Sequence, residues 1–474
     1  MNTLSFTSVV GLLLPCAAIA GNEWPAWRGA HGDGIASQGD LVAEWSTNHN
    51  ILWKAKIPGA GWSQPVVWDN RVFLTTAATT NQVKPKGGEF DPGLAFGGFG
   101  PPGQRGPGPG PWTSPDRIPH DFGNYTNAPP PPAPDVVYQW KVICLNLDNG
   151  QVRWEKTLRQ GKPATPIHRN NTYASETPVT DGERLFAYFG MNGLYCLDFE
   201  GQLRWSADLG SFPTQFGWGS GSSPVLYEDL LYIQCDNDKD SFLAAIDKRT
   251  GRERWRAARQ EQSNWSSPYV WKNCFRTELV TGGGTKLRSY DPKSGELLWE
   301  LKASGRTAIT PVGDGDFLYA DSYDRMMGGQ GLLVAIKPGA HGDISLNPGQ
   351  TTNQYVAWAT SLNSYRVASP LLYRGCLYQL DQQSGIVRCF DARTGALRYK
   401  ERLPGTRGFT ASPWASDGEV FCLDETGATV LLRAGPQFEI LATNRLEETM
   451  WASAAIADRR ILLRGVEYLY CIGK

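Results

Sequence analysis

Short runs of alternating apolar and polar residues recur along the chain and predict β-strands rather than helices. The clearest unit is Ala245–Trp255, where one strand ends at Asp247 and a second strand reaches Trp255. Asp247 is suited to cap a tight turn through its side chain, and Gly251 supplies the positive φ that the turn needs. The unit therefore predicts a β-hairpin whose terminal Trp can pack against a neighbour. Copies occur at Ser289–Trp299, Cys389–Tyr399, Cys144–Trp154 and, one residue shorter, Cys196–Trp205.

A second landmark precedes each hairpin: a pair of small polar residues, then Pro, then a short strand. Pro is tolerated at the first position of a strand because its missing N–H is not yet needed by the ladder. The copies are Ser63-Gln64-Pro65, Glu176-Thr177-Pro178, Ser222-Ser223-Pro224, Ser266-Ser267-Pro268, Ile309-Thr310-Pro311, Ala368-Ser369-Pro370, Ala411-Ser412-Pro413 and the degenerate Ala452-Ser453-Ala454.

The spacing of these landmarks predicts the architecture. From position 178 onward they are separated by 46, 44, 43, 59, 43 and 41 residues. A period of roughly 44 residues with four short strands is typical of a β-propeller blade. Eight landmarks therefore predict an all-β, eight-bladed propeller of four-stranded antiparallel blades.

The last blade, Trp451–Cys471, has room for only three strands. The segment Asn50–Lys54 carries the same terminal Trp, Trp53, and is expected to supply the fourth strand. Such closure joins the first and last segments of the chain and removes an open sheet edge.

Two blades carry insertions. Blade 1 holds a Pro/Gly-rich segment, 84–135, which cannot bury a core and is expected to be a surface loop. Blade 5 holds an extra stretch, Lys337–Tyr355, between its third and fourth strands. Residues 21–474 are otherwise interpreted as a single propeller domain.

The first 20 residues resemble a secretory signal peptide, with an apolar core at Val9–Leu14 and a small-residue cleavage site at Ala18–Ala20. Lipoprotein processing at Cys16 is the alternative, although Pro15 fits that site poorly. The chain is therefore expected to be exported to the periplasm or cell envelope. No later stretch approaches 18 unbroken apolar residues, so no transmembrane span is expected.

Composition and charge argue against two classes of function, nucleic-acid binding and metal binding. The net charge of −1 gives no electrostatic footprint for nucleic acid. Four cysteines, Cys144, Cys196, Cys389 and Cys471, share one repeat slot and are expected to be buried core residues. The five histidines show no paired ligand spacing, so no metal site is predicted. The acidic turn Asp236–Asp240, and Asp321 with Asp324, are interpreted as solvated turns.

Residues just before the landmarks should surround the mouth of the central channel. Aromatic and Arg side chains suit a planar or anionic ligand or a partner surface, although they could instead fill the axis and brace the blades. The candidate binding residues are Trp62, Glu176, Trp218, Trp265, Arg306, Arg366, Arg407 and Trp451, with Phe409 beside them.

The Ala-x-Asp-x-x-Thr-Gly-x-x-x-Trp string at Ala245–Trp255 resembles the tryptophan-docking motif of the PQQ-like repeat family, which includes quinoprotein dehydrogenases and BamB-type scaffolds. The resemblance implies the propeller fold and, for the dehydrogenases, pyrroloquinoline quinone (PQQ) with calcium. Those enzymes place an adjacent Cys-Cys disulfide against the quinone, and no such pair exists here. Their calcium ligands and catalytic Asp find no residue-by-residue match either, so no cofactor is predicted.

Three functions follow as hypotheses. The first is an exported, monomeric, non-enzymatic binding or scaffolding propeller, whose channel-mouth face takes a protein partner or a small planar or saccharide ligand. The second is a PQQ-dependent alcohol or sugar dehydrogenase. The third is a carbohydrate-binding module, because exposed Trp faces suit sugar rings.

Overall fold

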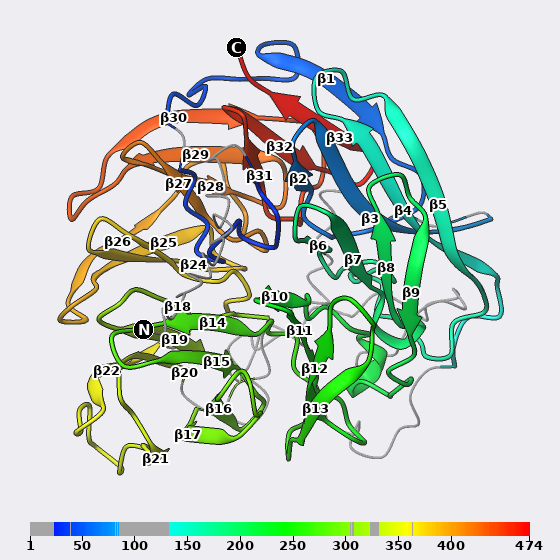
Figure 1. Cartoon of the computed structure of the whole chain (residues 1–474). Coiled ribbons are helices and arrows are strands. Elements are labelled where there is room, and N and C mark those ends of the chain that lie inside the picture. Colours follow the sequence, from blue (N-terminus) through cyan, green and yellow to red (C-terminus); the bar gives the residue numbers. More distant parts are fainter. Residues whose placement is uncertain are drawn as a thin grey trace, which may run out of the picture.

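The computed structural model describes residues 23–37, 39–80, 82, 84, 132–303, 305, 308–322, 331–362 and 364–474. Eight sheets are arranged around a central axis, so the predicted eight-bladed propeller is confirmed (Figure 1). Consecutive strands within a blade pair antiparallel, from the innermost strand near the axis to the outermost strand at the rim.

The strands of blades 1 to 4 are bounded as follows. Blade 1 contains β2 (Val66–Trp68), β3 (Arg71–Thr79), β4 (Tyr138–Asn146) and β5 (Val152–Gly161). Blade 2 contains β6 (Val179–Thr180), β7 (Arg184–Tyr188), β8 (Leu194–Asp198) and β9 (Leu203–Ala207). Blade 3 contains β10 (Val225–Tyr227), β11 (Leu230–Cys235), β12 (Phe242–Asp247) and β13 (Glu253–Ala258). Blade 4 contains β14 (Tyr269–Lys272), β15 (Thr277–Thr281), β16 (Lys286–Tyr290) and β17 (Leu297–Lys302).

The remaining blades repeat this order. Blade 5 contains β18 (Val312–Gly313), β19 (Leu318–Ser322), β20 (Gly331–Ile336) and β22 (Val356–Leu362). Blade 6 contains β23 (Leu371–Tyr373), β24 (Cys376–Leu380), β25 (Ile386–Asp391) and β26 (Leu397–Arg402). Blade 7 contains β27 (Trp414–Ser416), β28 (Glu419–Leu423), β29 (Ala428–Arg433) and β30 (Ile440–Arg445). Blade 8 contains β31 (Ala455–Ala457), β32 (Arg460–Arg464), β33 (Tyr468–Ile472) and β1 (Ile51–Lys56).

Blade 8 closes the ring as the sequence predicts. Strand β1 pairs antiparallel with β33, and Trp53 lies opposite Cys471. The first and last strands of the propeller therefore lie side by side, blue against red in Figure 1. The insertion of blade 5 adds a further strand, β21 (Gly342–Asp343), which pairs parallel with β17 of blade 4.

The recurrent Trp docks on the next blade. Five indole N–H groups donate to a backbone carbonyl there: Trp53 to Leu147, Trp154 to Phe199, Trp205 to Lys248, Trp255 to Pro292 and Trp358 to Ala392, at 2.7–3.1 Å. The ring lies under the turn glycine of that blade; a Cβ on Gly295 would stand 2.6 Å from the Trp255 ring. Glycine is thus required both for its positive φ and for this close approach. Trp299 differs, because its indole N–H donates to the Glu278 carboxylate of its own blade at 2.6 Å.

The landmarks are joined by a ring of hydrogen bonds around the axis, which we call the hydroxyl belt. In seven of the eight landmarks, the backbone N–H of the middle residue donates to the side-chain hydroxyl of the middle residue in the next landmark, at 2.9–3.1 Å. The acceptors are Thr177, Ser223, Ser267, Thr310, Ser369, Ser412 and Ser453. Gln64 takes the eighth position, where its Nε2 donates to the carbonyl of Ala454. The belt explains why a small hydroxyl residue precedes Pro in blades 2 to 7.

An N-terminal segment, residues 24–36, lies across this ring. Trp24 pairs with Val67 of blade 1, and Ile35 pairs with Ala415 of blade 7. Between them, the buried Arg28 donates from its backbone N–H to Gln64 Oε1 (2.7 Å) and from Nη2 to the carbonyl of Pro370 (2.7 Å). The segment therefore ties blades 1, 6 and 7 together. Its burial lowers the pKa of Arg28 to about 10.

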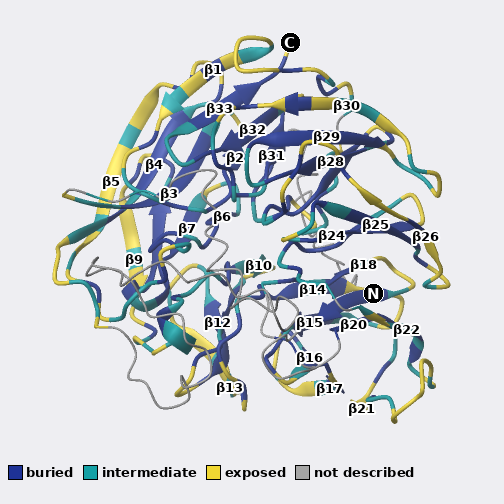
Figure 2. Ribbon diagram, turned by 180° about the vertical axis from the view of Figure 1, so that it is seen from behind, coloured by how far each residue is buried: buried dark blue, intermediate teal, exposed yellow. Residues whose placement is uncertain are grey.

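Apolar residues fill the spaces between blades, while the outermost strands such as β5 and β30 are exposed (Figure 2). Cys144, Cys196, Cys389 and Cys471 are buried there, as expected. Two short 3₁₀ turns, Gly190–Asn192 and Gln215–Gly217, lie in loops. No helix in the described part of the chain is long and apolar enough to cross a membrane. The expected signal peptide and most of the insertion at 84–135 lie outside the described residues; β3 and β4 flank that insertion.

Candidate functional site

Two of the predicted mouth residues meet across the seam that closes the ring. Trp62 precedes the landmark of blade 1 and Trp451 precedes that of blade 8. Their ring centroids lie 5.1 Å apart with the planes tilted by 33°. Both side chains are half-buried, and Trp62 Nε1 donates to the carbonyl of Asn170 at 3.1 Å. Trp62 and Trp451, which share one position in the repeat, therefore form one aromatic surface.

A second aromatic group lies before blades 3 and 4. Trp218 and Trp265 meet edge to face at 6.1 Å, and His168 stacks on Trp218 at 3.7 Å. Trp265 Nε1 donates to the carbonyl of Gly219 at 2.7 Å, which fixes its ring. His168 and Asn170 belong to the same loop between β5 and β6, so this loop joins the two groups. We call Trp451, Trp62, His168, Trp218 and Trp265 the aromatic arc.

His168 had no sequence signal as a site residue. It stands in no repeat slot, and its lack of ligand spacing argued only against zinc. Its place beside Trp218 depends on how the loop after strand β5 folds against the segment that precedes blade 3. A contact between residues 50 positions apart leaves no mark in local periodicity.

Glu176 is buried just before β6, the innermost strand of blade 2. Its side chain is 1% exposed, and Oε1 has no hydrogen-bond partner among the described residues. Burial raises the pKa of Glu176 to about 7, although a hydrogen bond with Ser220 acts in the opposite direction. The backbone carbonyl of Glu176 also accepts from Thr75 Oγ1 at 3.2 Å.

Arg366 is committed to an internal ion pair. Its Nε and Nη2 donate to the two carboxylate oxygens of Asp321, each at 2.7 Å, and both side chains are 1% exposed. Gln379 Nε2 donates to the same carboxylate at 2.5 Å. The interpretation of Asp321 as part of a solvated turn is therefore wrong, because Arg366, in the loop before blade 6, binds the Asp321 carboxylate in the protein interior. Asp324 lies outside the described residues.

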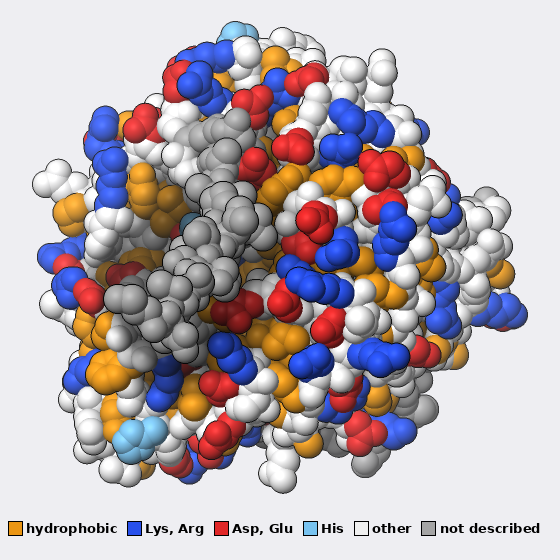
Figure 3. Space-filling model, viewed as in Figure 1, with side chains coloured by type: hydrophobic (Ala, Val, Ile, Leu, Met, Phe, Trp, Pro, Cys, Tyr) orange, Lys and Arg blue, Asp and Glu red, His pale blue; other side chains and the backbone are white. Residues whose placement is uncertain are grey.

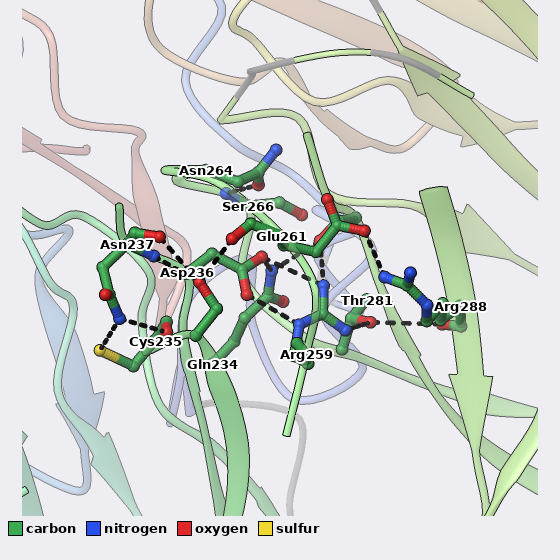
Figure 4. Close-up of polar contacts among 12 residues, drawn as sticks. Gln234, Cys235, Asp236, Asn237, Arg259, Glu261, Asn264, Ser266, Thr281 and Arg288 are labelled. Carbon is green, nitrogen blue, oxygen red and sulfur yellow. Dashed lines mark hydrogen bonds and ion pairs between the residues drawn. The ribbon is translucent and has the colours of Figure 1, made fainter. Parts of the chain in front are cut away.

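The same arrangement recurs in blade 3 (Figure 4). Arg259 donates to Asp236 through Nε (2.7 Å) and Nη2 (3.1 Å), with both side chains fully buried. Beside this pair, Glu261 accepts from Arg288 and from Thr285. Burial raises the pKa of Asp236 and Arg259 opposes that rise. The turn Asp236–Asp240 was predicted to be solvated, which is wrong for Asp236, whereas Asp238 and Asp240 are exposed.

The remaining predicted residues lie apart. Arg407 is exposed, and its backbone N–H donates to Asp424 Oδ2 at 2.9 Å. Phe409 is buried in the core between blades 6 and 7. Arg306 lies outside the described residues. The structure thus gathers the four predicted Trp residues in two groups and buries Glu176 and Arg366 in the protein interior. On the face shown in Figure 3, acidic and basic side chains are interspersed.

The described residues fit poorly to PQQ and calcium, the cofactors of the quinoprotein dehydrogenases. PQQ carries several carboxylates, and its Ca²⁺ takes 6–8 oxygen ligands. Within the described ranges no group of three or more His, Cys, Asp or Glu could hold a metal ion. Arg366 and Arg259, which could pair with the cofactor's carboxylates, are already bound to Asp321 and Asp236. The described residues therefore do not fit this group.

Comparisons with known sequences agree with the repeat pattern. Residues 136–257 and 239–340 match the family model described as outer membrane protein assembly factor BamB. The outer membrane protein assembly factor BamB of Moranella endobia (strain PCIT) is 26% identical over 176 residues, which cover 37% of this chain and 41% of that protein. The tetrathionate hydrolase of Acidithiobacillus ferrooxidans is 24% identical over 251 residues, covering 47% of this chain and 45% of that protein. The chain thus spans less than half the length of these relatives.

Solved structures share the fold at low identity. BamB from Moraxella catarrhalis superposes with a TM-score of 0.50 and 14% identity, over 70% of this chain and 91% of that one. The quinohemoprotein alcohol dehydrogenase from Comamonas testosteroni gives a TM-score of 0.57 and 10% identity, over 96% of this chain and 81% of that one. The repeats, the fold and the family model together show that this chain is built from repeats similar to those of the PQQ-like (quinoprotein and BamB-type) β-propellers.

Proposed function

We propose that this protein is an exported, non-enzymatic scaffold that binds a protein partner through the aromatic arc. The observation that carries the proposal is the arc itself: half-exposed Trp side chains on four blades, at a mouth where Arg366 and Arg259 are neutralised internally. Aromatic residues dominate the binding energy of protein interfaces, because they bury a large area at low entropic cost.

Rigidity supports the same proposal. Trp62 and Trp265 of the arc donate to backbone carbonyls, and the landmarks behind them are joined by the hydroxyl belt. A preorganised surface loses little conformational entropy on binding. Export and a place in the cell envelope are supported by the residues resembling a signal peptide and by the relative named as an outer membrane protein assembly factor.

The experiment is site-specific photo-crosslinking in the native host. A photoreactive phenylalanine analogue replaces Trp62 or Trp265, and in the control it replaces the exposed Ser206 of strand β9. We expect one discrete adduct from the arc positions and none from Ser206. The captured protein is then purified, and its affinity is measured with Trp62→Ala/Trp265→Ala and with Leu203→Ala, a side chain 47% exposed on the outer strand. The arc variant should bind at least about tenfold more weakly. Equal affinity of all three proteins would contradict the proposal.

The dehydrogenase hypothesis has one observation in its favour, the buried Glu176 carboxyl, whose Oε1 has no hydrogen-bond partner among the described residues. Mature protein incubated with PQQ and Ca²⁺ tests it by equilibrium dialysis and by dye reduction with simple alcohols. We expect neither quinone retention nor turnover. Stoichiometric retention of the quinone that is lost in Glu176→Gln would instead favour the enzyme.

A further inference from the structure

The contact between Trp62 and Trp451 crosses the seam where the first and last blades of the ring meet. The strand pairing that closes the ring does not fix this contact. Strand β1 adds to the outer edge of blade 8, whereas the two Trp residues precede the innermost strands, β2 and β31. Bonds made by the residues close to each Trp must therefore set how the two indole rings meet.

Arg464, the last residue of β32 in blade 8, reaches across this seam to blade 1. Its Nη1 donates to the carbonyl of Ser63 (3.1 Å) and to Ser63 Oγ (2.5 Å), one residue after Trp62. Gly61, one residue before Trp62, lies against the same guanidinium, and a Cβ on Gly61 would collide with Nη2 of Arg464. The backbone on both sides of Trp62 is therefore in contact with the side chain of Arg464.

The burial of Arg464 is costly for the fold. The residue is 1% exposed, and burial lowers the pKa of its guanidinium to about 9, with no neighbouring carboxylate among the described residues to oppose that fall. A buried charge without a counter-charge destabilises a folded protein. Arg259 and Arg366, by contrast, are each paired with a buried Asp. The hydrogen bonds of Arg464 to Ser63 are thus what the fold gains from this residue, and they lie at the seam.

Gln64, two residues after Trp62, makes a second bond across the seam. Its Nε2 donates to the carbonyl of Ala454, three residues after Trp451. Its Oε1 accepts from the backbone N–H of Arg28 at 2.7 Å, so both ends of the buried amide are held. The other seven landmarks carry Ser or Thr in this position. The landmark of blade 1 therefore differs from the rest in having a side chain long enough to tie the first blade to the last.

We propose that Arg464 and Gln64 are positioning residues that hold Trp62 and Trp451 together across the seam. Arg464 supports the backbone beside Trp62, and Gln64 ties that backbone to the loop that carries Trp451. Because Arg464 and Gln64 are each 1% exposed, they act through the Trp pair and not on a partner directly. The proposal rests on the function proposed above only in treating this pair as part of a binding surface.

Circular dichroism of the full mature chain tests the proposal without any partner. Two indole rings 5.1 Å apart couple their electronic transitions and give an exciton couplet. The chain has 18 tryptophans, so the couplet of this pair is measured as the difference between each protein and its Trp62→Phe form. We expect Arg464→Met and Gln64→Met, which remove the donors but keep a long side chain, to lose most of that difference. Arg464→Lys, which keeps a cationic donor, should retain more of it than Arg464→Met.

Ser267→Ala is the matched control, because it removes one bond of the hydroxyl belt between blades 3 and 4, away from the seam. It should keep the couplet of the Trp62 and Trp451 pair. Thermal unfolding shows which variants are folded at the temperature of measurement, and Gln64→Met carries the test if Arg464→Met does not fold. An unchanged couplet in either folded seam variant would overturn the proposal, and so would an equal loss in Ser267→Ala. A loss confined to the seam variants would support it whatever the photo-crosslinking shows, so the two proposals can fail separately.

Discussion

The indole ring of Trp205 lies against the backbone of Gly251 in the next blade, so closely that a Cβ on Gly251 would stand 2.5 Å from the ring. The ring can pack this closely only because Gly251 has no side chain. This contact joins one hairpin turn to the outer strand of the preceding blade, and it recurs at four other blade junctions through Gly150, Gly201, Gly295 and Gly395.

Gly251→Ala should destabilise the propeller by about 2–5 kcal/mol, because the new methyl group overpacks the Trp205 ring and strains a residue at φ +71°. Gly375→Ala is the matched control: Gly375 has φ +74° but open space where its Cβ would lie. It should cost only the backbone strain, about 1–2 kcal/mol. Urea denaturation measures both, and equal losses would show that the ring contact contributes nothing.

The hydroxyl belt predicts a specific cost for losing one member. Ser267→Ala removes the acceptor of the buried Ser223 N–H (2.9 Å), so that a buried donor is left unsatisfied. We expect a loss of about 1–3 kcal/mol in the free energy of unfolding. Ser206→Ala, at an exposed position of β9, should change it by less than about 0.5 kcal/mol. A neutral Ser267→Ala variant would argue that the belt does not stabilise the ring.

The buried ion pair of Asp236 and Arg259 should be far more sensitive than an exposed one. Asp236→Asn leaves the fully buried guanidinium without its counter-charge and should cost about 3–5 kcal/mol. Asp316→Asn breaks an ion pair with Arg393 whose side chains are 60% and 71% exposed, and should cost at most about 1 kcal/mol. Chemical denaturation at one pH compares them. Similar losses in the free energy of unfolding of the two variants would contradict this prediction.

Glu176 should make stability depend on pH. Its pKa is raised from 4.5 to about 7, so the folded state keeps a proton that the unfolded state releases. The contribution is fully present below pH 4.5 and is lost as the pH rises to about 7, a difference of roughly 3 kcal/mol. Glu176→Gln should flatten that part of the stability profile between pH 4.5 and 7. Parallel profiles for the two proteins would contradict a raised pKa.

Much of the fold was predictable from the sequence because the signals are local. The Asp-to-Gly turn, the terminal Trp and the Pro step each lie within one hairpin, and their spacing alone gave eight blades and the closing strand at Trp53. The candidate site was predictable only in part. Trp62 and Trp451 share a repeat slot, so the sequence could pair them by position, although not by contact.

What the sequence by itself determined is therefore the propeller, its closure and the aromatic character of the mouth. Only the tertiary structure decided which polar groups remain available there. Asp321 and Arg366 are 45 residues apart and form a buried pair, and His168 stacks on Trp218 from a loop outside the repeats. The physical reason is that periodicity encodes which face of a strand is buried, whereas the charge and burial of a mouth residue depend on partners supplied by neighbouring blades.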